Sequence, residues 1–240
     1  MQGAGALNSA QVAKALRPRN ATEEQILQTT REMLTEEDLD EISIDKIARR
    51  AFVSRTNVYF YFPNKRAIVD RLIKQTFVDI YAAAAIYIEG SGEPRGELQK
   101  AFSRVVTVVN RDATVLLLAA RLSDQGDDLP HEWRPYINRL VQSVESRIRG
   151  DQERDDAPSD IPPRPAALAL CAMVERHITY EVFRDDRVHS ESIWILAELW
   201  WRAVYSRPPG PAMTDSGVAS EAAAVRPAVA AAAPTGFELS

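Results

Sequence analysis

The side chains best suited to chemistry lie in one short stretch, residues 54–62, which reads SRTNVYFYF. If the stretch is helical, Val58 and Phe62 are one turn apart and can both pack inward. Arginine can pair with guanine, asparagine with adenine, and hydroxyl groups can bind phosphates. The stretch is therefore a candidate for entering a groove of double-stranded DNA. Its outward-facing side chains would be Arg55, Thr56, Asn57, Tyr59 and Tyr61.

Two short helices are needed to hold such a stretch in place. Residues 43–51 have apolar side chains at the spacing of one helix face, with Ser43 as the expected N-cap. A tight turn over 52–54 leads into the second helix. That helix must end near Phe62, because Pro63 disfavours helix in the residue before it. Two short helices joined by a tight turn, with bases on the second, fit a helix-turn-helix.

The helix that follows Pro63 adds one more candidate DNA contact. Asn64 can cap this helix, and Lys65 lies in its first turn. The first backbone N–H groups of a helix have no partner within it. A phosphate bound there would meet both those N–H groups and the ammonium of Lys65.

The charge of the chain is unevenly placed. The formal net charge is -5, which taken alone argues against a polyanionic partner. Residues 46–74, however, hold eight Lys or Arg and one Asp, whereas residues 75–240 sum to -7. A basic block of this kind is either a footprint for nucleic acid or a solvated helix face, and charge alone leaves both interpretations open.

Residues 54–65, which end in Tyr-Phe-Tyr-Phe-Pro-Asn-Lys, resemble the recognition helix and the next helix start of the TetR family of bacterial transcriptional regulators. The resemblance covers about residues 22–70. It implies a homodimer with two DNA-binding heads, a palindromic DNA operator and a helical core that binds a small effector. A ligand-responsive regulator, specifically a repressor, is therefore expected.

The same resemblance assigns roles by position. It implies that Arg55, Thr56 and Asn57 face bases or phosphates. It implies that Arg17 and Arg19, in an N-terminal arm, can reach a minor groove. The side chains that it places on the DNA backbone are Ser43, Tyr59, Tyr61 and Lys65.

Three residues depart from the family pattern. Phe52 stands in the turn where the family usually has glycine, so it is strained if the backbone there needs a positive φ, unless the turn is built differently. Phe60 replaces a polar residue of some relatives, which removes one possible phosphate contact. Asn57 stands where threonine is common. The operator sequence therefore cannot be predicted from the family.

A weaker resemblance links the rest of the chain to the mycobacterial ethionamide-resistance branch of the family. It rests on the run Phe60–Pro63, on Met173–Arg176 and on the position of Trp200. This branch implies an elongated lipophilic effector in an apolar core, although aromatic side chains at helical spacing also suit an ordinary packed core. The candidate lining residues are Phe102, Trp133, Cys171, Glu175, Tyr180 and Trp200.

Strand signals are nearly absent and helical spacing recurs, so we expect an all-α fold of about nine helices. The first of these helices is expected to begin at a capping box formed by Thr22 and Gln25. The last two, 166–184 and 188–205, are expected to form the homodimer interface. The expected domains are a flexible arm (1–20), a helix-turn-helix domain (21–64), a ligand-binding and dimerisation domain (65–206) and a disordered Ala/Pro-rich tail (207–240).

No pattern in the sequence points to catalysis, a metal or a cofactor. The three histidines do not form metal-binding or di-iron spacings, and no nucleotide-binding or nucleophile motif occurs. The single cysteine, the absence of a signal-peptide core and the absence of an apolar run of about 18 residues favour a cytoplasmic protein that does not enter the membrane. The alternative to a regulator is a helical-bundle enzyme or lipophile-binding protein that does not bind DNA.

Overall fold

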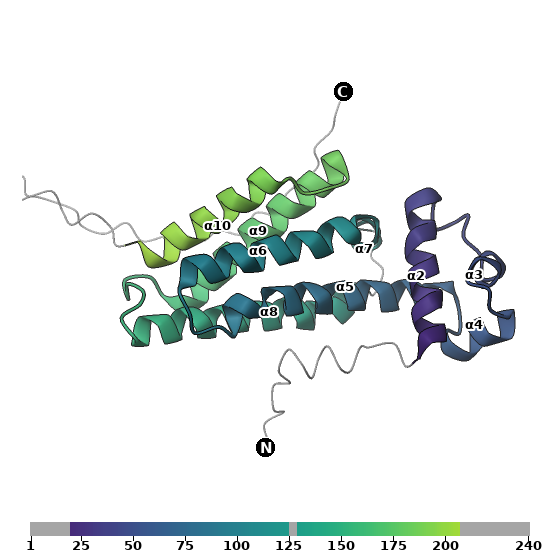
Figure 1. Ribbon diagram of the computed structural model, residues 1–240, viewed down its shortest axis with the longest axis horizontal. Coiled ribbons are helices and arrows are strands. Elements are labelled where there is room, and N and C mark those ends of the chain that lie inside the picture. The colour runs from purple at the N-terminus through teal and green to yellow at the C-terminus, as the bar shows by residue number, and fades with distance from the viewer. Residues whose placement is uncertain (1–19, 125–128, 207–240) are drawn as a thin grey trace, which may run out of the picture. The chain divides into compact units, whose positions relative to one another are not determined.

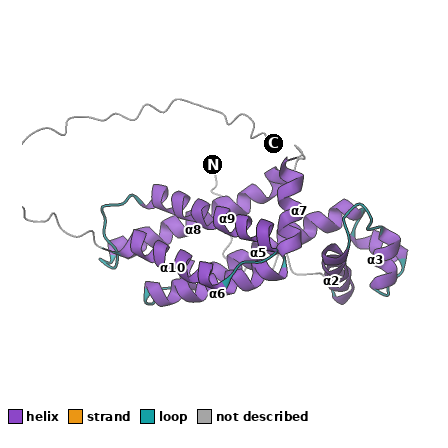
Figure 2. Cartoon of the chain, turned by 90° about the horizontal axis from the view of Figure 1, so that it is seen from above, coloured by secondary structure: helices purple, strands orange, loops and turns teal. Residues whose placement is uncertain are grey.

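The computed structural model describes residues 20–124 and 129–206, although the side chains of 123–134 are left out. This part of the chain forms nine α-helices and no strand, which confirms the all-α prediction (Figures 1 and 2). The predicted tail and nearly all of the predicted arm lie outside the described residues. The helices are α2 (Ala21–Glu36), α3 (Ile44–Arg50), α4 (Arg55–Tyr61), α5 (Lys65–Ile88), α6 (Pro94–Arg111), α7 (Ala113–Asp124), α8 (Leu129–Glu153), α9 (Pro163–Asp185) and α10 (Ser190–Tyr205).

The helices α2, α3 and α4, here called the head, share one hydrophobic core with the start of α5. Ile26, Ile47, Val58 and Ile68, one from each of these helices, are all fully buried. Side chains of α7, among them Val115, join the same cluster. The head is therefore packed against the remaining helices through both α5 and α7 (Figure 1).

The second half of α5 belongs to a different cluster, built with α6, α8, α9 and α10. Phe102 of α6 and Trp200 of α10 are buried there beside Tyr87 of α5. With 24 residues, α5 is about 36 Å long at about 1.5 Å per residue, long enough to join both clusters. No helix among the described residues is long and apolar enough to cross a membrane.

Several helices begin or end outside the predicted bounds. The capping box at Thr22 is wrong, because α2 begins at Ala21 and the side chain of Asn20 accepts the Glu23 N–H at 3.0 Å. The helix predicted over 166–184 starts earlier, at Pro163, and α6 likewise begins with a proline, Pro94. Proline is well tolerated in the first turn, where its missing N–H has no intrahelical partner to lose.

The turn between α3 and α4 has the geometry that glycine normally supplies. Phe52 has a φ of 53°, in the left-handed region. The Phe52 N–H donates to Arg49 O at 3.2 Å and the Val53 N–H donates to Ala48 O at 3.0 Å. This pair of hydrogen bonds is the Schellman motif, which requires a left-handed residue after the helix. The strain expected for Phe52 is therefore present, because its Cβ crowds the backbone there.

We expect Phe52→Gly to raise the free energy of unfolding by about 1 kcal/mol, because glycine adopts the left-handed conformation without a steric penalty. The Phe52 side chain is 91% exposed, so little packing is lost. Urea denaturation measures the change. The control is Phe52→Ala, which also removes the ring but keeps the Cβ. An equal gain in both variants would show that the exposed ring, and not the backbone, is responsible.

Candidate nucleic-acid interface

The helix-turn-helix is capped at both helix starts by serine. The Ser43 side chain accepts the Lys46 N–H at 3.2 Å, and the Ser54 side chain accepts the Asn57 N–H at 3.1 Å. Both hydroxyl groups act as acceptors here, so their own protons are free to be donated elsewhere. The Ser43 hydroxyl is therefore compatible with the phosphate contact predicted for it.

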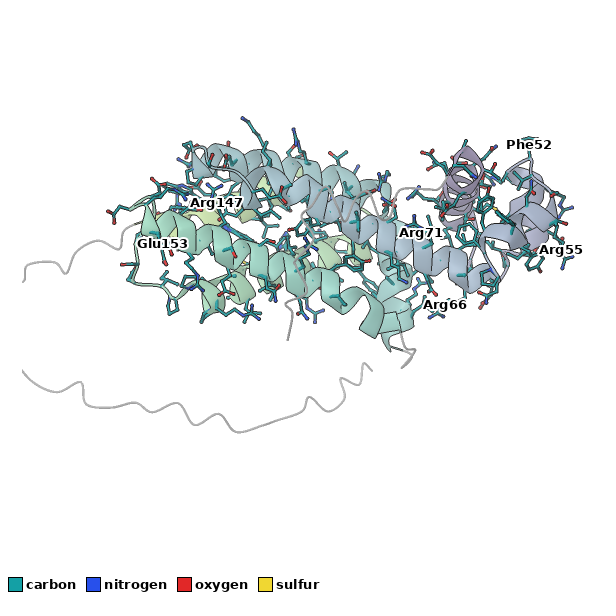
Figure 3. All side chains as sticks on the ribbon, turned by 90° about the horizontal axis from the view of Figure 1, so that it is seen from below. Phe52, Arg55, Arg66, Arg71, Arg147 and Glu153 are labelled. Carbon is teal, nitrogen blue, oxygen red and sulfur yellow. The ribbon has the colours of Figure 1, made fainter. Side chains whose placement is uncertain are left out.

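The outer face of α4 carries the predicted DNA-binding side chains. Val58 and Phe62 are buried, as the helical spacing predicted. Tyr61 is only half-buried, and its hydroxyl accepts a hydrogen bond from Asn20 at the start of α2. Figure 3 shows Arg55 and Phe52 projecting from the head, far from Arg147 in the core helices. The exposed side chains of α4 are those of Arg55, Thr56, Asn57, Tyr59 and Phe60.

The guanidinium group of Arg55 is held in place by two neighbours. One terminal nitrogen lies 3.2 Å from the carboxylate of Asp45 on α3, and the other donates to the Tyr59 hydroxyl at 3.3 Å. Both contacts raise the pKa of Arg55, the Tyr59 hydrogen bond most of all. The remaining N–H groups of the fork can face a base. Sequence reasoning missed Asp45, whose only signal was an acid beside a basic block.

Other basic residues of the head are paired with carboxylates of α2 or of the loop after it. Lys46 lies 2.6 Å from Glu37, and Arg50 pairs with Glu36. The hydrogen bond from Arg50 lowers the pKa of Glu36. The basic block seen in the sequence is thus partly neutralised by the acidic residues that precede it.

Lys65 is also occupied within the protein. Its ammonium donates to Ile42 O at 2.9 Å and to Leu39 O, so it holds the loop between α2 and α3. An ammonium has three donors, so one remains for the predicted phosphate contact. The contacts predicted for Arg17 and Arg19 fall on residues outside the described part.

The candidate ligand site is divided by the structure. Phe102 and Trp200 are buried with their rings 5.7 Å apart at 76°, and Cys171 packs against the same cluster. Burial raises the pKa of the Cys171 thiol to about 12, so the thiol stays protonated and unreactive beside these rings. Glu175 and Tyr180 are exposed instead, because the buried face of α9 follows residues 167, 170, 178 and 182. The side chain of Trp133 lies outside those described.

A buried polar network borders this apolar cluster and was missed by sequence reasoning. The Trp200 indole donates to the Tyr87 hydroxyl at 3.3 Å, and the Tyr87 and Tyr205 hydroxyls are 2.9 Å apart. Tyr205 donates to Asp151 at 2.6 Å, and Arg147 contacts the same carboxylate. Burial raises the pKa of Tyr87 to about 12. The sequence signal was the i, i+4 spacing of an Arg and an Asp in α8.

Large apolar side chains are exposed along α9 and α10. Monomeric proteins rarely leave extended apolar patches in contact with water, so such a surface usually meets another protein. The most exposed is Phe183 at 74%, followed by Tyr180 at 59% and Trp194 at 58%. The remaining members are Leu168, Ile195 and Leu199.

Two family models match the chain, one over the head and one over the core helices. The first, described as bacterial regulatory proteins of the tetR family, matches residues 26–72. The second, described as the C-terminal domain of the transcriptional regulator EthR, matches residues 98–206. Between the two matches lie residues 73–97, which comprise the rest of α5, the α5–α6 loop and the first turn of α6.

Individual relatives agree with these matches. The HTH-type transcriptional regulator EthR of Mycobacterium tuberculosis H37Rv is 26% identical over 75% of this chain and 85% of its own length. The EthR of Mycolicibacterium smegmatis is 21% identical over 77% of this chain and 86% of its own length. Among solved structures, NalD, the secondary repressor of a multidrug efflux pump in Pseudomonas aeruginosa, shares the fold with a TM-score of 0.58. It is 21% identical and covers 77% of this chain and 95% of its own.

Proposed function

Since the chain belongs to the TetR family and carries an EthR-type C-terminal domain, we propose that it represses transcription by binding a palindromic operator as a homodimer, and that a small lipophilic effector releases it. The observation that carries the proposal is the exposed polar face of α4, held by a Schellman turn as the second helix of a helix-turn-helix. A protein with this role acts where the chromosome is, in the bacterial cytoplasm.

We assign the DNA contacts by the direction of the side chains. Arg55, Thr56 and Asn57 lie in the first turn of α4, the part of a recognition helix that reaches base edges. Their exposure supports this assignment. The side chains proposed to hold the DNA backbone are Ser43, Tyr59, Tyr61 and Lys65, with Arg17 and Arg19 proposed for the minor groove.

The homodimer is proposed to form through α9 and α10. Two copies of this helix pair would make a four-helix bundle that covers the exposed apolar side chains. A two-fold axis uses the same patch on both subunits, so one self-complementary surface suffices. It would also place two copies of α4 on successive turns of the major groove, about 34–36 Å apart.

The effector is proposed to bind among the core helices, beside Phe102, Cys171 and Trp200. These side chains offer apolar contact, and the neighbouring Tyr87 hydroxyl offers a polar group. Because α5 joins the head cluster to this cluster, a ligand that prefers one packing of the core would change the tilt of α5. The shift in operator affinity is limited by the difference in ligand affinity between the two states.

The test begins with selection of duplexes from a random-sequence DNA library by the purified full-length chain. We expect a near-palindrome, bound less tightly as salt rises. We expect Arg55→Ala to weaken that binding about 30-fold or more, because each lost base pairing costs roughly 1–3 kcal/mol and a dimer loses two. Gel shifts measure the change.

The matched control is Arg149→Ala, which removes an exposed arginine that pairs with Glu145 within α8. It should leave operator affinity unchanged. If the wild-type chain selects no duplex at low salt, the DNA-binding role is wrong and a helical-bundle enzyme or lipophile-binding protein becomes the better interpretation.

A further inference from the structure

A single residue joins α6 to α7. The first helix ends at Arg111 and the second begins at Ala113, so Asp112 alone lies between them. Its N–H donates to Val108 O at 3.0 Å, and its carbonyl accepts the Leu116 N–H at 3.0 Å. Asp112 is thus bonded into both helices, and a movement of either helix must carry it along.

The carboxylate of Asp112 is fully buried and is held from several elements. Thr76 of α5, itself 0% exposed, donates to it at 2.8 Å. Arg111 donates to both of its oxygens, at 3.1 and 2.6 Å. Arg31 of α2 brings its Nε to 2.7 Å, in an ion pair whose N–H is not aligned as a hydrogen bond. The carboxylate of Asp112 is therefore contacted by the head, by α5 and by α6.

The Arg31 contact differs from the others because it can be removed by substitution without leaving the buried carboxylate unpaired. When the ion pair with Arg31 is broken, the Asp112 carboxylate still accepts hydrogen bonds from Arg111 and Thr76, so its charge stays paired. The side chain of Arg31 is 14% exposed, and its other end already bonds to Gln28 within α2 at 2.9 Å. A buried charge without any partner would be costly, but after separation Arg31 keeps Gln28 and Asp112 keeps Arg111.

The joint is also connected to the candidate ligand site along α6. Phe102, which packs against Trp200, lies ten residues before Asp112 on this helix. Ten residues of helix span about 15 Å, so α6 is a short rigid link between the two places. A shift of α6 at Phe102 would therefore move Asp112 relative to Arg31 and change the distance of their ion pair.

We propose that Asp112 is a positioning residue for DNA binding: through Arg31 it fixes the orientation of the head on the core helices, and so sets the half-site spacing that the dimer accepts. This inference rests on the proposed function. It concerns the geometry between the two heads and not the base contacts of either. Breaking the ion pair should therefore alter the preferred spacing without altering the preferred half-site sequence.

The experiment uses the palindrome selected by the wild-type chain, together with duplexes whose centre is one base pair longer or shorter. One base pair shifts a half-site by about 3.4 Å and turns it by about 35°. We expect the wild-type dimer to lose about tenfold in affinity for each change, comparable with a mismatched base pair. We expect Arg31→Met to lose less than about threefold, because a freer head can follow the displaced half-site.

Two further variants separate positioning from folding. Arg31→Lys keeps a cation near Asp112 and should restore part of the spacing preference. Arg149→Met, which removes an arginine far from the joint, should keep the wild-type profile. If methionine unfolds the head, Arg31→Gln gives the same comparison with a polar, uncharged side chain.

The outcomes are distinct. A folded, dimeric Arg31→Met variant with the wild-type spacing profile overturns the inference and leaves the proposed function intact. A change in half-site sequence preference also overturns it, since Arg31 would then act on base contacts. A wild-type chain that binds no duplex overturns the proposed function and the inference with it.

Discussion

Arg147→Met is expected to lower the free energy of unfolding by about 3 kcal/mol, because it breaks the buried ion pair with Asp151 and removes the donor of several further hydrogen bonds. Asp151 keeps the Tyr205 hydroxyl and the partly exposed Arg154, so its charge is not left without any partner. The side chain of Arg147 is 3% exposed and that of Asp151 is 0% exposed. Arg147 also donates to the carbonyls of Tyr87 and Gly90 at 2.7 Å and to Glu97 at 2.6 Å. It thus ties α8 to the end of α5 and to the start of α6.

Urea denaturation followed by circular dichroism measures this loss. Arg149→Met is the matched control, since it removes the same group two residues away, where the arginine is exposed and pairs only within α8. Exposed pairs contribute about 0–1 kcal/mol, so the control should unfold near the wild-type midpoint. Equal losses in the two variants would mean that the buried network adds nothing specific to stability.

The double variant Trp194→Asp, Leu199→Asp is expected to raise the dimer dissociation constant at least about 100-fold. In a two-fold interface each substitution occurs in both subunits, so four carboxylates would be buried there. Both side chains are exposed in the single chain, at 58% and 48%. Their replacement should therefore leave the fold of the subunit intact. Operator binding should fall with the dimer, since one head alone reads only half of the palindrome.

Sedimentation measures the subunit association, and gel shifts on the selected palindrome measure the binding. Ile137→Asp places a carboxylate on α8 at a side chain that is 41% exposed, and it should change neither quantity. If the double variant dimerises with the same dissociation constant as the wild-type chain, the dimer interface does not lie on α9 and α10.

The elements of the head could be predicted because local rules decide them. The spacing of Val58 and Phe62 set which face of α4 is buried, and Pro63 set where that helix ends. The possible strain at Phe52 was signalled by the family resemblance, because the family usually has glycine at this position, and the positive φ found there matches that signal. The start of α2 was harder, because Asn20 and Thr22 both have side chains suited to capping, and the structure uses Asn20.

The links between distant residues could not be predicted. Arg31 and Asp112 are 81 positions apart, and nothing in the sequence marks either as the other's partner. Lys65 was predicted to bind a phosphate at the start of α5, and no sequence feature indicated that its ammonium also bonds to carbonyls of the loop before α3. The resemblance to the ethionamide-resistance branch placed Glu175 and Tyr180 in the ligand site, but the packing of α9 leaves both side chains exposed.

The ion pairs of Lys46 with Glu37 and of Arg50 with Glu36 have a consequence for how the head meets a polyanion. DNA binding usually gains entropy when salt ions condensed on the duplex are released by incoming cations. In this head Lys46 and Arg50 are already paired with carboxylates of the same chain. A phosphate that meets Lys46 or Arg50 displaces a tethered carboxylate, so binding should release fewer net ions, and depend less steeply on salt, than the number of Lys and Arg in the head suggests.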